Sequence, residues 1–98
     1  MTAMIRVMYD RRGPVLRLTG HANYAPAGQD IVCAAVSGCL YTVLAMLPDH
    51  PGRRIRWAPG DVVLAVPGRR ARRVLERAAE VLEQIAQQYP GQVQVERR

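Results

Sequence analysis

Proline and glycine stand side by side at five places, and these pairs divide the chain into short segments. The pairs are Gly13-Pro14, Pro51-Gly52, Pro59-Gly60, Pro67-Gly68 and Pro90-Gly91. Proline lacks a backbone donor and glycine adopts turn conformations easily, so such pairs end helices and strands. We therefore expect turns or element ends at these five places, and regular structure in the segments before, between and after them.

The segments around the first and third pairs have the pattern of strand hairpins. Residues 3–10 alternate apolar and polar side chains, with Ile5, Val7 and Tyr9 on one face, and 15–19 follow the turn at Gly13-Pro14. Residues 54–57 and 62–66 flank the turn around Pro59-Gly60 in the same way. After the last pair, residues 92–96 can form one more short strand.

Two longer segments have helical spacing. Asp30 offers a side-chain acceptor to cap a helix that runs to about Leu47, after a loop containing Pro26 and Gly28. The predicted buried stripe of this helix is Val36, Leu40, Val43, Leu44 and Leu47. The second helix follows Pro67-Gly68, with apolar positions Val74, Ala78, Val81, Leu82, Ile85 and Tyr89.

The predicted order is therefore strand, strand, helix, strand, strand, helix, strand. This order indicates an α+β fold, with two helices packed on one mixed, largely antiparallel sheet, ββαββαβ. Ninety-eight residues are enough for a single domain, spanning 1–98. We expect the helix-free face of the sheet to be exposed or to serve a dimer contact.

Charge and apolar content limit the partners of the chain. The net charge is +6 and all 14 basic residues are arginine, which points to anionic partners, although a GC-rich genome alone would favour arginine over lysine. No apolar run approaches the ~20 residues of a membrane span, and the first ten residues do not resemble a secretion signal. We expect a cytoplasmic protein with Cys33 and Cys39 reduced; six residues apart on one helix, they point in different directions.

Chemistry is concentrated between Gly20 and Ser37. His21 follows a strand, and Cys33 is expected at about the third helical position after Asp30, where backbone N–H groups and the helix dipole favour a thiolate. Cysteine catalysis needs a nucleophile, a base and donors for the oxyanion. His21 and Cys33 supply the first two, and the N–H groups of Ile31, Val32 and Cys33 are expected to supply the donors.

Each of these residues also has a structural explanation. Taken alone, Cys33 is interpreted as a small buried helix residue and His21 as a packed or exposed histidine. Asp30 is interpreted first as a helix cap and only second as a group that orients His21. Ser37 lies one turn beyond Cys33, and we assign it a supporting role. Gly20 and Gly28 are expected to permit unusual backbone angles or close approach at the two ends of the loop.

A metal site or a bound cofactor is not expected. The candidate zinc ligands are His21, Cys33, Cys39 and His50, and they lack a short ligand pair of the usual type. Four arginines open the second helix, where their charge opposes the dipole, so they form either a solvated face or an anion-binding patch.

The run Gly20-His21-Ala22, then Gly28, then residues 30–37 (Asp-Ile-Val-Cys-Ala-Ala-Val-Ser) resembles the signature of the bacterial ribosomal-processing cysteine protease family, Prp. The resemblance implies an endopeptidase that removes the N-terminal extension of a large-subunit ribosomal protein during ribosome assembly. Carried over by position, His21 is the general base and Cys33 the nucleophile, and the motif includes Asp30 and Ser37.

The resemblance also implies a homodimer and a mobile loop between the catalytic residues, here residues 24–29. Substrate extensions in the family tend to be apolar and basic, so the +6 charge favours contact with ribosomal RNA rather than attraction of the peptide. The alternative hypothesis is a small basic RNA- or ribosome-binding module without catalysis. Against it, the chain has no phenylalanine, and Trp57 and the tyrosines form no evident stacking motif.

Overall fold

The computed structural model describes residues 4–20 and 27–98, with the backbone alone at 27–30. Its elements confirm the predicted order. They are β1 (Ile5–Asp10), β2 (Val15–Thr19), α1 (Ala27–Met46), β3 (Arg54–Ala58), β4 (Asp61–Ala65), α2 (Arg69–Gln88) and β5 (Val93–Arg97).

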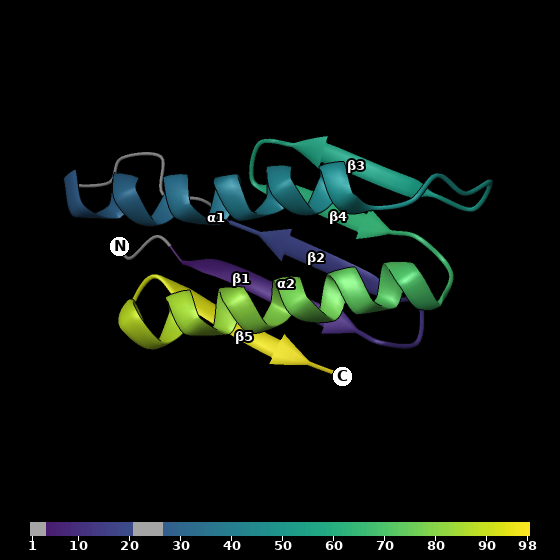
Figure 1. Cartoon of the computed structure of the whole chain (residues 1–98). Coiled ribbons are helices and arrows are strands. Elements are labelled where there is room, and N and C mark those ends of the chain that lie inside the picture. Colours follow the sequence, from purple (N-terminus) through teal and green to yellow (C-terminus); the bar gives the residue numbers. More distant parts are fainter. Residues whose placement is uncertain (1–3, 21–26) are drawn as a thin grey trace.

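The strands form one five-stranded mixed sheet in the order β3-β4-β2-β1-β5. β1 and β5 run parallel, and the other three neighbouring pairs are antiparallel, as the two short hairpins require. Both helices cover the same face, α1 on the side of β3 and β4 and α2 on the side of β1 and β5 (Figure 1). The predicted α+β fold is therefore confirmed.

The core lies between this face and the helices. Leu16 of β2 is paired with Leu64 of β4, and both are almost fully buried, as are Leu75 and Leu82 of α2. The predicted stripe of α1 is buried at Val36, Leu40, Val43 and Leu47, with Leu44 half-buried. The register therefore brings the apolar face of each strand under the helices, where burial stabilises the fold.

The predicted stripe of α2 is confirmed at Ala78 and Leu82 and differs elsewhere. Ala71, Leu75 and Ala79 are fully buried, whereas Val74 is half-buried and Val81 is 45% exposed. The buried face is therefore centred on Ala71, Leu75 and Ala79, and the two valines lie at its margin.

The start of α1 also differs. The predicted helix begins after Asp30, but α1 already begins at Ala27, so Gly28 and Asp30 lie inside it and Asp30 is not its cap. Ala27 follows Pro26 in the sequence, and proline is tolerated at the start of a helix, where N–H groups need no intrahelical partner.

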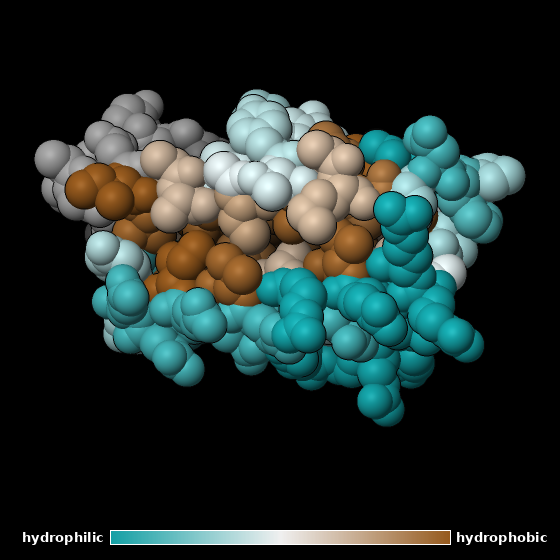
Figure 2. Space-filling view, viewed as in Figure 1, coloured by the Kyte–Doolittle hydropathy of each residue, from teal (hydrophilic) through white to brown (hydrophobic). Residues whose placement is uncertain are grey.

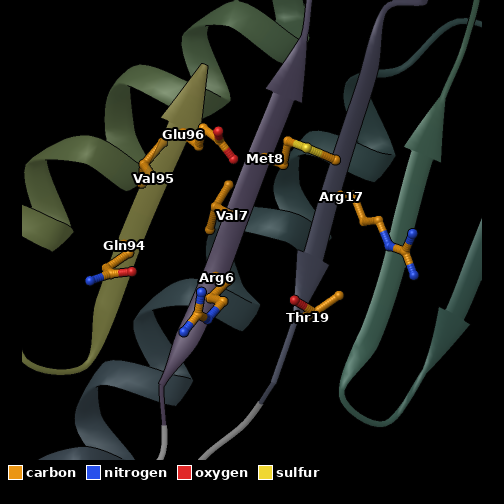
Figure 3. Close-up of a pocket in the computed structure, with 8 residues that line it drawn as sticks. All are labelled: Arg6, Val7, Met8, Arg17, Thr19, Gln94, Val95 and Glu96. Atoms are coloured by element: carbon orange, nitrogen blue, oxygen red, sulfur yellow. The ribbon is translucent and has the colours of Figure 1, made fainter. Parts of the chain in front are cut away.

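Neither of the described helices covers the other face of the sheet, as expected. A cavity of about 560 Å³ lies there, and its polar lining residues are Arg6, Arg17, Thr19, Gln94 and Glu96, together with Met8 (Figure 3). They come from β1, β2 and β5, and the helices lie behind the sheet in this view. Neither cysteine lines this cavity, so it is separate from the site that the sequence indicates.

Candidate active site

Gly20 fixes how the chain leaves β2. Its φ is +86°, and a Cβ at this position would lie 2.2 Å from the carbonyl oxygen of Met4. Its N–H donates a hydrogen bond to the carbonyl oxygen of Gly60 over 3.0 Å. The predicted need for an unusual angle and a close approach is confirmed here, because both the angle and the contact exclude other residues.

Cys33 lines a cavity of about 320 Å³ between α1 and the strands of the hairpin β3–β4. Gly20 lines the same cavity from the end of β2, and Pro59 and Gly60 line it from the β3–β4 turn. Cys33 itself is half-buried, so its sulfur borders the core and remains in contact with the cavity.

Ser37 lies one turn after Cys33 and lines the cavity beside it, as the spacing predicts. Among the lining residues that the structure describes, none carries a charge. The described lining therefore offers a bound molecule apolar contacts and hydrogen bonds.

The helix start changes the role of the backbone near Cys33. Cys33 is the seventh residue of α1, in its second turn, and not the third as predicted. The N–H groups of Ile31, Val32 and Cys33 therefore pair with carbonyl groups one turn earlier and are not free to bind an oxyanion. The prediction of these three N–H donors is wrong, because it depended on a helix that starts at Asp30.

Cys39 lies on a different side of the same helix. It lines a groove of about 520 Å³ between α1 and α2 with Val43, Val74 and Ala78, whereas Cys33 faces the sheet side. Both thiols are free, which agrees with the prediction that they cannot bridge. Burial raises the pKa of the Cys39 thiol, so it is less readily ionised than an exposed cysteine.

The structure describes the remaining predicted site residues, His21, Gly28 and Asp30, incompletely. His21 lies outside the described residues, and so do residues 24–26 of the predicted loop. Ala27–Gln29, the rest of that loop, are helical. Gly28 and Asp30 are therefore placed as backbone positions in the first turn of α1, and the structure does not describe the Asp30 side chain.

Sequence reasoning missed the aromatic end of the cavity. Tyr41 of α1 and Trp57 of β3 both line it, with stacked rings whose centroids are 4.8 Å apart and whose planes differ by 24°. This stacking joins two side chains of the chain itself, so it does not test the expectation that Trp57 and the tyrosines lack a motif for stacking on RNA bases. The signal was the four-residue spacing of Cys33, Ser37 and Tyr41, which puts all three on one side of the helix.

Among the side chains that the structure describes, those of residues 4–20 and 31–98, no three of His, Cys, Asp or Glu cluster where they could hold a metal ion. Neither described helix is long and apolar enough to cross a membrane.

The sequence matches the family described as cysteine protease Prp over residues 2–94. The chain belongs to this family. It is accordingly a cysteine protease, a hydrolase, and this membership favours the protease hypothesis over a non-catalytic RNA-binding module. No curated protein matches the sequence significantly.

Solved structures show the same fold as this Prp-family chain. Two are of the essential ribosomal processing protease Prp from S. aureus. The one with a covalently linked product peptide has a TM-score of 0.74 and 19% identity, and the one with a substrate peptide 0.75 and 17%; each covers 98% of this chain and 99% of that one. SMU.848 from Streptococcus mutans has a TM-score of 0.72 and 18% identity, and the match covers 98% of this chain and 93% of that one.

Proposed function

We propose that this Prp-family protease removes the N-terminal extension of a bacterial large-subunit ribosomal protein during ribosome assembly. The observation that carries the proposal is Cys33, half-buried beside Ser37 in a cavity whose described lining carries no charge, in a chain that belongs to a cysteine protease family. The S. aureus proteins of the same fold are named ribosomal processing proteases and were solved with peptides, which supports a peptide substrate.

In the proposed reaction, Cys33 is the nucleophile and His21 the general base. His21 takes the thiol proton, and the Sγ thiolate attacks the carbonyl carbon of the scissile peptide bond. When the C–N bond breaks, the amine of the mature protein leaves with the proton that His21 returns. The extension stays on Sγ as a thioester until water, deprotonated by His21, releases it as a carboxylic acid and restores the thiol.

The backbone around Gly20 supports the assignment of His21. Gly20 lines the cavity that contains Cys33, and it is covalently bonded to His21, so consecutive Cα atoms are only about 3.8 Å apart. Ser37 supplies a hydroxyl in the same cavity, and we give it the supporting role that the α1 backbone donors cannot have. Gly28 and Asp30 act, in this proposal, by forming the first turn of the helix that carries Cys33.

Peptide cleavage by single variants tests this proposal. The wild type and the variants Cys33→Ala, His21→Ala and Cys39→Ala are incubated with an N-terminal peptide of a large-subunit ribosomal protein. We expect cleavage by the wild type and by Cys39→Ala, and a loss of several orders of magnitude in the first two variants, since nucleophile and base act as a unit. Equal cleavage by all four proteins would sink the proposal.

Contact with ribosomal RNA near the substrate is a further part of the proposal. α2 begins with exposed arginines at 69, 70, 72 and 73. The first turn of this helix contains no acidic residue that could balance their charge. We expect binding to ribosomal RNA that weakens steeply with salt and that weakens further when these arginines are replaced by glutamine. An affinity for ribosomal RNA that changes neither with salt nor with these substitutions would exclude the contact.

We also propose a cytoplasmic homodimer. The cytoplasm follows from a ribosomal substrate, and the dimer rests on the family resemblance alone. Light scattering after size exclusion measures the mass directly, and we expect twice the 10.9 kDa of one chain. A single-chain mass at the concentrations that support cleavage would contradict the dimer.

A further inference from the structure

The stacked pair Tyr41–Trp57 is more exposed than a pair that only completes the core. Tyr41 is 60% exposed and Trp57 38% exposed, although their rings are in contact. Trp57 pairs with the buried Val62 of β4, so it lies on the helix side of the sheet, at the edge strand. The pair therefore links α1 to β3 and leaves aromatic surface open to a ligand.

The floor between Cys33 and this pair is apolar and closed. Leu18 and Val62 of the sheet and Leu40 of α1 line it, and each is more than nine-tenths buried. Among the lining residues that the structure describes, polar side chains are few and none is charged. A side chain that enters this end of the cavity exchanges water for apolar and aromatic contacts, which favours aromatic or bulky aliphatic residues.

Helix geometry gives the distance from the nucleophile. Tyr41 is eight residues after Cys33 on α1, and at about 1.5 Å per residue the two lie roughly 12 Å apart along the axis. An extended peptide covers about 3.3 Å per residue. A substrate bound along the cavity therefore places the residue three or four positions from the scissile bond at the aromatic pair.

We propose that Tyr41 and Trp57 form a specificity subsite that binds an aromatic or bulky aliphatic side chain of the substrate, three or four residues from the scissile bond. The proposal rests on the function proposed above, with Cys33 as nucleophile. In this proposal, an apolar contact with α1 and β3 selects the cleavage site, and the net positive charge of the chain does not.

Trp57 is the chain's single tryptophan, so its fluorescence reports binding without any catalysis. The Cys33→Ala variant is titrated with the N-terminal ribosomal-protein peptide and with versions in which each bulky apolar residue is replaced singly by alanine. We expect the intact peptide to shift the Trp57 emission. One replacement should weaken binding about tenfold or more, the loss that corresponds to an unburied aromatic or large aliphatic side chain.

A coupled experiment identifies Tyr41 as the partner of that side chain. In the Tyr41→Ala/Cys33→Ala variant, the sensitive replacement should change affinity less than threefold, since the contact is already absent. In the catalytically intact background, Trp57→Leu and Tyr41→Ala should lower kcat/KM for the intact peptide and not for the replaced one. Met46→Ala is the matched control, because Met46 is 57% exposed on the same helix but lines the groove toward α2.

The outcomes separate the two proposals. An unchanged Trp57 emission at saturating peptide, or equal losses for every peptide in the Tyr41→Ala variant, would overturn the subsite even if the wild type cleaves. Binding with the expected pattern but no cleavage by the wild type would retain the subsite and overturn the proteolytic proposal. Thermal unfolding of each variant excludes loss of fold as the cause, and Trp57→Leu keeps apolar bulk at the hairpin edge.

Discussion

The N–H of Gly20 donates a hydrogen bond to the carbonyl oxygen of Gly60, with the two atoms 3.0 Å apart. The bond continues the β2–β4 ladder beyond the pair Thr19–Asp61 and joins the end of β2 to the β3–β4 turn. Both glycines line the cavity of Cys33. The position from which the chain continues to His21 is therefore fixed by the sheet.

Replacing Gly20 with alanine should damage both stability and cleavage. The Cβ would approach the Met4 carbonyl to 2.2 Å, and the φ of +86° is unfavourable for alanine, so we expect a loss of about 1–3 kcal/mol in the free energy of unfolding. Urea unfolding and peptide cleavage measure the two effects.

Gly38→Ala is the matched control for that substitution. A Cβ on Gly38 meets nothing within 4 Å, and the residue lies inside α1, so alanine should raise stability by up to about 1 kcal/mol. Two variants of equal stability would refute the strain assigned to Gly20.

The two cysteines should react with alkylating reagents in a fixed order. Burial raises the pKa of Cys39, so at about pH 7 iodoacetamide should modify Cys33 first, and the Cys39 rate should rise as the pH increases. Mass spectrometry of the single variants Cys33→Ala and Cys39→Ala assigns each rate. Modification of Cys39 before Cys33 would contradict the placement of the two thiols.

Tyr9 should make stability fall at high pH. Burial, then the charge and hydrogen bond of Glu76, raises the pKa of Tyr9 to about 12 from 10.0, and the hydroxyl donates to Glu76 Oε1 over 3.4 Å. The folded state thus holds this proton more tightly than the unfolded chain. The contribution of Tyr9 to the free energy of unfolding is complete below the pKa that Tyr9 has in the unfolded chain. It is lost as the pH rises toward the pKa that Tyr9 has in the folded state.

Unfolding free energies at about pH 9 and pH 11 measure this loss. We expect Tyr9 to contribute about 1 kcal/mol to the decrease, and Tyr9→Phe to remove that part. Identical decreases in the wild type and Tyr9→Phe would show that Tyr9 does not titrate as its surroundings require.

The buried face of α2 should depend on Leu75 more than on the predicted Val81. Leu75 is fully buried, and its replacement by alanine leaves a cavity that costs about 2–5 kcal/mol. Val81→Ala, at a 45% exposed position, should cost well under 1 kcal/mol. Chemical denaturation of both variants tests the order, and the reverse order would contradict the orientation of α2.

Most of the fold was predictable because local signals agreed with one another. The Pro–Gly pairs locate the turns, and alternation at Ile5, Val7 and Tyr9 identifies a face that the structure buries. The parallel pairing of β5 with β1 was not predictable from local pattern, since it depends on where α2 returns the chain.

The position of Gly20, Cys33 and Ser37 beside one cavity was predictable, because it depends on a strand end and on helical spacing, which are local features. The start of α1 was not, because Asp30 is a good cap in isolation and only the whole helix shows that the turn before it is also helical. Trp57 was missed because its contact with Tyr41 joins two elements, and no local pattern encodes which ring meets which.

Covalent trapping tests the central claim, Cys33 as the nucleophile, most directly. The full chain is incubated with a peptide chloromethyl ketone based on the ribosomal-protein cleavage sequence, and the modified residue is located by mass spectrometry. We predict one adduct on Cys33, blocked by excess uncleaved peptide, absent in Cys33→Ala and strongly slowed in His21→Ala. An adduct on Cys39, or a Cys33 adduct formed equally fast without His21, would contradict the account.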